Sequence, residues 1–259
     1  MEFFYNLNVY NQALIASIIA MFMTISGAAT VFLFKKVNKS VMESMVAVSA
    51  GIMLAAAIFS LLLPSIEQAT ELNMNTSLVV TISILMGSLL LIVGDLIASK
   101  KIKDNSSKTS NVLLLVLSIV LHNIPEGMAI GVAFGSIVYN LEGATVAAAI
   151  SIALGIAIQN FPEGAAISIP IRRLGISRTK AFLIGASTGI VEPLSALVGV
   201  YLVLKIKLIL PFLLAFAAGA MIFVIVSELI PEALENKRKN LMTYLFLIGF
   251  VLMMLLELM

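Results

Sequence analysis

The sequence predicts an all-α polytopic membrane protein with eight transmembrane helices, arranged as an inverted-repeat (3+2+3) helical bundle. Three observations lead to this prediction. The chain of 259 residues is 61% hydrophobic and only 12% charged, whereas soluble domains average about 45–50% apolar and about 25% charged residues. Apolar runs of about 20 residues, enough to cross the hydrocarbon core as a helix, recur along the chain. A polar six-residue motif also occurs twice, in two consecutive runs.

The apolar runs determine the expected domain organisation. None of them alternates apolar and polar residues over about ten positions, as strands of a transmembrane barrel would. The connections are too short for a soluble domain, so residues 1–259 are expected to form a single transmembrane domain with a short cytoplasmic loop at 99–110. The expected spans are residues 12–34, 45–63, 77–98, 111–138, 144–170, 181–204, 208–230 and 240–259.

Basic residues indicate the orientation of the spans. With the N-terminus outside, fourteen of the sixteen Lys and Arg residues fall in cytoplasmic loops, and only Lys205 and Lys207 fall on the other side. This bias follows the positive-inside rule, and it predicts a multi-pass protein of the cell membrane with both termini extracytoplasmic. The net charge of +2 is then a topology signal, and no nucleic-acid partner is expected. The absence of cysteine excludes disulfides and thiolate metal sites.

The motif HNIPEG at 122–127 returns as QNFPEG at 159–164, each time inside an apolar run. Extended to nine residues, HNIPEGMAI and QNFPEGAAI agree at six positions. Consecutive spans run antiparallel, so the two copies are expected to meet as an inverted pair. A site is therefore predicted between spans four and five.

The residue types and their spacing in this motif suit a metal ion. Residues four apart share a helix face, which pairs His122 with Glu126 and Gln159 with Glu163. Imidazole, carboxylate and amide oxygen are ligand types used by zinc and other divalent metals. An acid inside the bilayer costs a few kcal/mol, and every Lys and Arg lies in a loop or at a span end. Such acids can be protonated, hydrated by a cavity or matched by a cation.

Proline and glycine complete the motif. Pro125 and Pro162 remove backbone N–H donors, so both helices are expected to break there, which a membrane tolerates where protein or a hydrated cavity satisfies the backbone. Gly127 and Gly164 allow a neighbouring helix to approach closely.

These features resemble the ZIP (Zrt/Irt-like) family of divalent metal transporters, and its bacterial GufA-type branch in particular. The resemblance rests on HNxPEG in the fourth span, QNFPEG in the fifth and eight helices with outward termini. It implies uptake of zinc, with cadmium, iron and manganese as further cargo, into the cytoplasm. It also implies a homodimer in which spans one, four, five and six move against the other four.

The same resemblance implies the roles of individual residues. A first metal would be held by His122, Glu126, Gln159 and Glu163, with Met53 joining, and Glu126 and Glu163 would bridge to a second. The second ion would be held by Asn123, Asn160 and Glu192, so that one or two ions bind. Asp95 and Glu228 match positions of an exit pathway. Asn160 stands where a family pattern has Asp, which removes one negative charge, and the 99–110 loop lacks the histidines of many members.

Plainer interpretations accompany these assignments. His122 can be a packing histidine, buried amides such as Asn123, Gln159 and Asn160 often only join helices, and Glu192 can be a protonated structural acid. Met53 is one of 14 methionines, and Asp95 and Glu228 can be interfacial acids.

Two other functions are left open by the residues. An intramembrane metal-dependent hydrolase would need three firm ligands and an activated water, which one His and no Cys argue against. A passive metal channel is the other. We expect a transporter without a catalytic cofactor, in contact with metal ions and the lipid bilayer, and not an enzyme.

Overall fold

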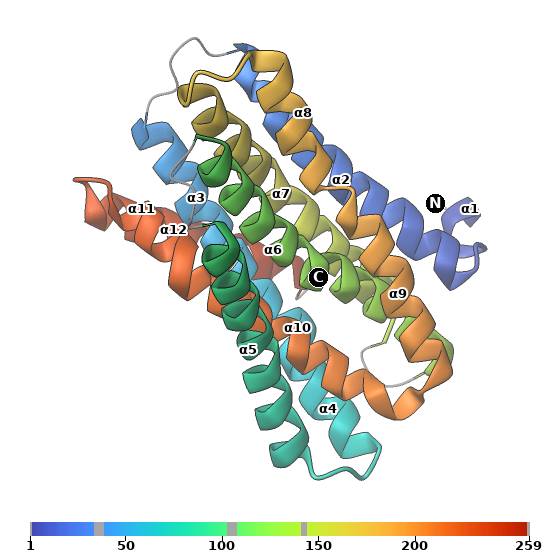
Figure 1. Cartoon of the computed structure of the whole chain (residues 1–259). Coiled ribbons are helices and arrows are strands. Elements are labelled where there is room, and N and C mark those ends of the chain that lie inside the picture. The colour runs from blue at the N-terminus through green and yellow to red at the C-terminus, as the bar shows by residue number, and fades with distance from the viewer. Residues whose placement is uncertain (1, 34–38, 103–107, 141–143, 258–259) are drawn as a thin grey trace.

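The computed structural model describes residues 2–33, 39–102, 108–140 and 144–257, and these form a bundle of long helices without a strand (Figure 1). The α-helices are α1 (Glu2–Tyr5), α2 (Val9–Leu33), α3 (Lys39–Ala55), α4 (Leu63–Glu71), α5 (Thr76–Ile102), α6 (Lys108–Ser136), α7 (Val146–Arg173), α8 (Arg178–Thr188), α9 (Val191–Lys205), α10 (Leu210–Val224), α11 (Ile230–Leu234) and α12 (Lys239–Glu257). Two π-helical segments, η1 (Ala56–Leu62) and η4 (Ile225–Leu229), and two 3₁₀ turns, η2 (Ile137–Tyr139) and η3 (Lys207–Ile209), join them.

Seven stretches of the described chain are long and apolar enough to cross a membrane. They are Val9–Leu33, Lys39–Glu71, Thr76–Gly94, Val146–Arg172, Arg178–Lys205, Lys207–Leu234 and Lys239–Glu257. The all-helical membrane architecture predicted from composition is thereby confirmed. The remaining expected span, 111–138, coincides with α6, a helix of 29 residues that is not among the seven.

Helix ends extend beyond the apolar runs. The second stretch begins at Lys39 and ends at Glu71, where the sequence predicted 45–63, because a helix continues into the interface after its apolar segment ends. The loop expected at 99–110 is shorter than predicted: α5 continues to Ile102 and α6 begins at Lys108.

Four helix pairs make the most extensive contacts, namely α2 with α7, α6 with α9, α3 with α12 and α5 with α10. At each pair, glycine brings two backbones together. A Cβ atom added at Gly27 would lie 1.9 Å from the Phe161 carbonyl oxygen, and one at Gly51 would lie 1.9 Å from that of Phe246. Small residues at such contacts are the usual way in which helices associate in lipid, where van der Waals packing replaces hydrophobic burial.

These pairs divide the bundle into two groups of helices, which we call group A and group B. Group A contains α2, α6, α7, α8 and α9, and group B contains α3, η1, α4, α5, α10, η4, α11 and α12. A large apolar core lies where the groups meet, with Ile130 and Ile156 from group A and Leu61, Leu210 and Met221 from group B, all at most 1% exposed. The closest backbone contacts lie within each group, whereas ordinary side-chain packing joins one group to the other.

The prolines change the helices at places that the motif alone does not indicate. We predicted breaks at Pro125 and Pro162, and this was wrong: α6 and α7 run through both residues without interruption. Proline removes one N–H donor, and the protein packed around α6 and α7 allows both helices to continue despite the loss.

The backbone departs from α-helical geometry before two other prolines. The π-helical segments η1 and η4 each end two residues before a proline, at Pro64 and Pro231. In each case the next residue, Leu63 or Ile230, donates its N–H to the carbonyl five residues back. The wider turn makes room for the proline ring at the carbonyl four residues before it.

The Gly27 contact predicts a stability effect. Gly27→Ala would force α2 away from the backbone of α7, and overpacking of this kind costs about 1–3 kcal/mol. Gly94→Ala is the matched control, because its Cβ would meet only the flexible end of Leu121. We expect a lower midpoint of thermal unfolding in detergent for Gly27→Ala and little change for Gly94→Ala. Equal midpoints would show that the two backbones do not touch.

Candidate metal centre

The two PEG motifs bring their polar residues together inside the bundle. Asn123 and Glu126 of α6, and Gln159 and Asn160 of α7, are all at most 1% exposed. Glu126 Oε1 accepts a hydrogen bond of 2.6 Å from Gln159 Nε2. This bond joins the two copies directly, so the sequence repeat corresponds to one shared polar centre.

Glu192 forms a second part of this centre. Its side chain is fully buried and accepts hydrogen bonds from three helices: from Asn160 Nδ2 at 2.8 Å, from Thr24 Oγ1 at 3.1 Å and from Asn123 Nδ2 at 3.4 Å. The helix that carries it is interrupted just before it. Gly189 and Ile190 separate α8 from α9, with Glu192 N–H bonded to the Gly189 carbonyl in a tight turn. The helix at this site is therefore interrupted in the sixth expected span.

Glycine after each motif glutamate determines how closely the other helices approach. A Cβ atom at Gly127 would lie 2.3 Å from the carbonyl oxygen of Glu192, and one at Gly164 would lie 2.0 Å from that of Thr24. The close approach predicted for these two glycines is thereby confirmed. It is what allows Glu192 to reach the motif amides, and Thr24 to reach Glu192.

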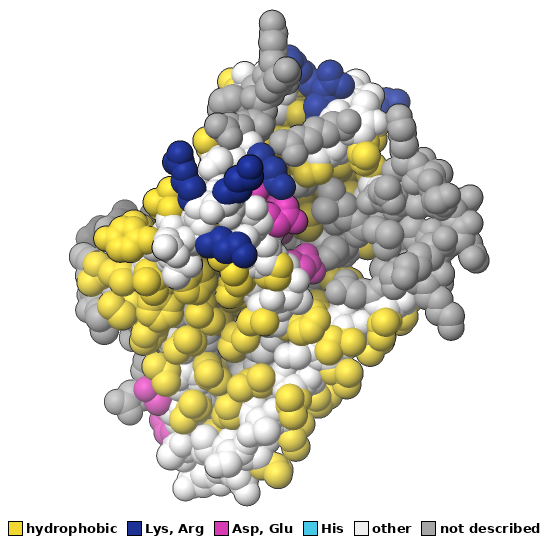
Figure 2. All heavy atoms as spheres, turned by 90° about the vertical axis from the view of Figure 1, so that its left-hand side faces the viewer, with side chains coloured by type: hydrophobic (Ala, Val, Ile, Leu, Met, Phe, Trp, Pro, Cys, Tyr) yellow, Lys and Arg dark blue, Asp and Glu magenta, His cyan; other side chains and the backbone are white. Residues whose placement is uncertain are grey.

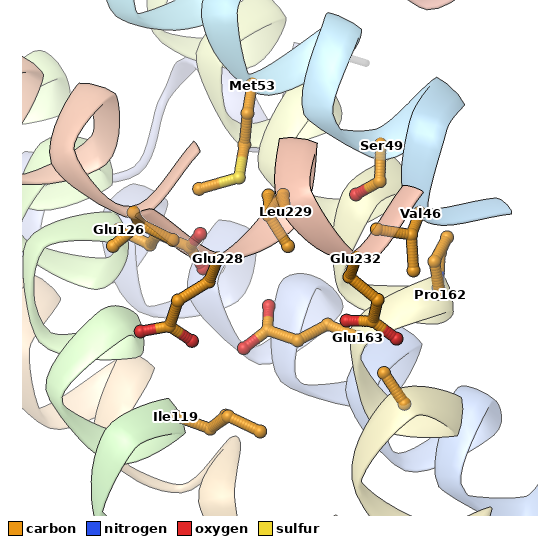
Figure 3. Close-up of a pocket in the computed structure, with 12 residues that line it drawn as sticks. Val46, Ser49, Met53, Ile119, Glu126, Pro162, Glu163, Glu228, Leu229 and Glu232 are labelled. Carbon is orange, nitrogen blue, oxygen red and sulfur yellow. The ribbon is translucent and has the colours of Figure 1, made fainter. Parts of the chain in front are cut away.

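A cavity of about 100 Å³ adjoins the centre, and carboxylates dominate its polar lining. Glu126 and Glu163 come from group A, and Glu228, Glu232 and Met53 come from group B. Figure 3 shows the carboxylates of Glu163, Glu228 and Glu232 turned toward the same space, with the Met53 side chain directed toward it from α3. We call this space the central cavity.

The oxygens of the centre lack hydrogen-bond donors. Seven buried side-chain atoms of the described chain have no hydrogen-bond partner, and five of them are Asn123 Oδ1, Glu126 Oε2, Gln159 Oε1, Asn160 Oδ1 and Glu163 Oε1. Buried polar atoms are nearly always satisfied, so such a concentration calls for an explanation. Amide and carboxylate oxygens that converge without donors match the requirement of a cation.

The predicted residues are distributed as follows. Asn123, Glu126, Gln159, Asn160 and Glu192 are joined by hydrogen bonds, while Met53, Glu163 and Glu228 line the central cavity. The side chains of His122 and Asp95 lie outside the part of the chain that the structure describes. Within that part, no three His, Cys, Asp or Glu side chains are gathered closely enough to hold a metal by themselves.

Three residues of the site were not identified from the sequence. Thr24 bonds Glu192 from α2, Ser49 Oγ donates to the Gln159 carbonyl at 3.4 Å, and Glu232 lines the central cavity. Glu232 could have been found, because it follows Glu228 by four residues and so shares a helix face with it. Thr24 and Ser49 resemble many other small polar residues of the spans, so only the tertiary structure identifies them.

A second cavity, of about 480 Å³, continues from the first toward one end of the bundle. Glu228 and Glu232 line both, and Glu43, Glu235 and Lys39 are added here. Lys39 Nζ lies 2.8 Å from Glu235 Oε2 and 3.5 Å from Glu43 Oε1. Figure 2 shows the basic side chains of this face gathered at one end of the molecule, with acidic side chains beside them. We call this end the basic end.

Comparison with known proteins agrees with the geometry. The family model described as "ZIP Zinc transporter" matches residues 95–257. The chain is 32% identical to "Zinc transporter ZIP11" of Homo sapiens, over 95% of this chain and 96% of that protein. It is 35% identical to "Zinc transporter ZIPB" of Bordetella bronchiseptica, over 90% and 76% of the two chains. It is 34% identical to "Zinc transporter GufA" of Myxococcus xanthus, over 94% and 97%.

The hydrogen bond from Thr24 predicts an effect on metal affinity. Partners that orient a ligand typically contribute about 10–100-fold to metal affinity, so Thr24→Val should weaken the binding of a Zn²⁺ ion held by Glu192 by about tenfold or more. Thr30→Val is the matched control, since Thr30 is also buried on α2 but bonds only the Gly27 carbonyl. Isothermal titration of the purified proteins measures both, and equal dissociation constants would contradict the role of Thr24.

Proposed function

Because the chain belongs to the ZIP zinc transporter family, we propose that this protein carries divalent metal ions, zinc first, from outside into the cytoplasm. Its relatives are named zinc transporters, and metal is the cargo here. The observation that carries the proposal is the group of buried oxygens without donors on α6 and α7. Such oxygens replace the water shell of a cation, which lets it cross a region that lipid otherwise closes.

The ligands of the cargo follow from how the side chains are already engaged. We assign a first ion to His122, Glu126, Gln159 and Glu163, with Met53 from group B. The amide of Gln159 donates to Glu126 through Nε2, so its oxygen is left for the metal. Two glutamates balance the charge of one divalent ion, and this ion is expected to bind more firmly than a second.

A second ion would rest on Glu192 and the oxygens of Asn123 and Asn160. Both amides donate to the Glu192 carboxylate, which keeps that carboxylate satisfied when the second position is not used. Since Asn160 supplies no charge, the second ion has one carboxylate of its own and shares Glu126 and Glu163. We therefore propose one ion as the resting load and a second at high concentration.

The route of release runs from the central cavity to the basic end. Glu228 and Glu232 line both cavities, so an ion leaving Glu163 meets carboxylates at each step. By the positive-inside rule the basic end faces the cytoplasm. This supports an inward-facing arrangement, both termini outside, and residence in the cell membrane. Asp95 is expected to join this route from α5.

Away from the basic end, an apolar layer closes the path. Ala57 of η1, Ile130 of α6, Ile156 of α7 and Ala218 of α10 are at most 1% exposed and lie beyond the central cavity on their helices. An ion cannot pass this layer without a change in conformation. This supports a carrier that alternates access, and it argues against a continuously open channel.

The packing supports a 3+2+3 inverted repeat in a single transmembrane domain. In this arrangement α6 is the fourth span along the chain and brings the number of spans to eight. Exchanging the first three spans with the last three, and the fourth with the fifth, turns the α2–α7 pair into the α9–α6 pair. It also turns the α3–α12 pair into the α10–α5 pair, and all four are the extensive contacts of the bundle. We propose that group A moves as a unit against group B, in a homodimer.

The two motif glutamates test the proposed function. In proteoliposomes containing a zinc-sensitive dye, Glu126→Gln with Glu163→Gln should abolish most saturable Zn²⁺ influx, because the substitution keeps the side-chain shape and removes both charges. His122→Ala alone should act in the same direction. Lys205→Ala is the control, since Lys205 is exposed and contacts only the ring of Tyr201 among the interactions found for it.

Normal influx in the double variant would overturn the site, and flux that never saturates with concentration would indicate a channel. A competition series of zinc with cadmium, manganese and iron then ranks the cargo ions.

A further inference from the structure

A third polar cavity, of about 230 Å³, lies at the end of the bundle opposite the basic end. We call it the outer cavity. Its polar lining comes from η1 and α4 (Ser60, Glu67 and Gln68), from the last residue of α12 (Glu257), and from Ser136 and Thr145 at the ends of α6 and α7. Among the described residues that line it there is no Lys or Arg. None of these residues belongs to the polar centre formed by the two motifs and Glu192, which we call the transport centre.

Gln68 is the residue that most clearly indicates a ligand. Its side chain is 2% exposed, and its Oε1 atom is buried without a hydrogen-bond partner, although it lines a polar cavity. Outside the transport centre, only one other buried side-chain atom of the described chain, Ser168 Oγ, lacks a partner, and Ser168 does not line this cavity. A buried amide oxygen without a donor, in a cavity that Glu67 and Glu257 also line, suits a positively charged group.

Glu257 is the second residue of this cavity that suits a positively charged ligand. Its carboxylate accepts a hydrogen bond from Ser60 Oγ, which joins the end of α12 to the π-helical segment η1. Only one carboxylate oxygen is engaged in that bond. Glu257 lines the outer cavity together with Gln68 and the exposed Glu67. The candidate metal ligands of this cavity are all oxygen atoms, which suits a divalent ion that keeps part of its water shell.

The outer cavity and the cavity at the basic end are built from matching segments. SLLLPSIEQA at 60–69 aligns with SELIPEALEN at 227–236, and serine, leucine and proline recur at equal positions. Each segment contains the end of a π-helical stretch and the proline two residues after it. In this alignment Gln68 corresponds to Glu235, which lines the cavity at the basic end.

The outer cavity also lies directly above the transport centre. Met53 and Ser60 are seven residues apart on one helix, as are Glu126 and Ala133 on another, which is a rise of about 10 Å. The apolar layer of Ala57, Ile130, Ile156 and Ala218 separates the two cavities. An ion in the outer cavity would therefore wait one step from the site it enters.

We propose that the outer cavity is a separate binding site for a hydrated divalent metal ion, formed by Glu257, Glu67 and the amide oxygen of Gln68, which collects cargo before transport. This inference rests on the proposed function for its role and on the geometry alone for the site. Binding here raises the local concentration of metal above the closed apolar layer.

Binding is tested without transport, in the variant Glu126→Gln with Glu163→Gln. Isothermal titration with Zn²⁺ should detect residual binding in this background. Adding Glu257→Gln, which can still accept from Ser60, or Gln68→Leu, which removes the amide oxygen, should abolish it. Glu71→Gln is the matched control, since Glu71 ends the same helix but does not line the cavity. No residual binding, or residual binding that survives Glu257→Gln and Gln68→Leu, would overturn the site.

Kinetic measurements of Zn²⁺ uptake distinguish a site that collects metal from a hydrogen bond that only stabilises the fold. With the motif glutamates intact, Glu257→Gln and Gln68→Leu should raise KM for Zn²⁺ uptake by about tenfold, at the lower end of the effect of a charge-lined cleft. The maximal rate should be unchanged. A fall in maximal rate with constant KM would contradict the collecting role. If the wild type binds metal in both sites but does not transport it, the proposed function fails while the outer site remains.

Discussion

Carboxylates that are buried among apolar helices are the constraint on which this structure depends. The ion pairs of Lys39 at the basic end include none of Glu126, Glu163 and Glu192. Amides and a hydroxyl satisfy Glu192 and one oxygen of Glu126. The oxygens that remain are the ones that a metal ion fits. Stability and transport thus place opposite demands on the same atoms, since each donor added would remove a ligand.

Close backbone contact is how the bundle meets this constraint. Gly127 and Gly164 let α9 and α2 approach the motifs to the point where a single Cβ atom would collide with a carbonyl. Three helices of group A then direct donors at Glu192. Group B contributes Met53, Glu228 and Glu232 from across the apolar interface. If group A moves against group B as proposed, the centre loses the side chains that group B contributes, which would favour release of the ion.

The departures from regular helix have separate purposes. The motif prolines leave α6 and α7 continuous, and the break in the chain occurs at Gly189 and Ile190, before Glu192. The π-helical segments before Pro64 and Pro231 lie beside the outer cavity and the central cavity, respectively. Irregular backbone at membrane depth is tolerated where protein or a polar cavity satisfies it. The outer cavity and the central cavity thus each adjoin a π-helical segment that precedes a proline, in keeping with the proposed inverted repeat.

The sequence by itself determined the membrane class, the helical architecture, the pairing of the two motifs and the family, because apolar runs and a repeated motif are local properties of the chain. It also identified the glycines that allow close approach. Only the tertiary structure decided which donors reach Glu192, that Thr24 and Glu232 belong to the site, and that the helices pass unbroken through the motif prolines. It also brought Gln68 and Glu257 to one cavity from positions far apart in the chain. Those features depend on contacts between helices, and the residue pattern within one span does not determine which helices pack against it.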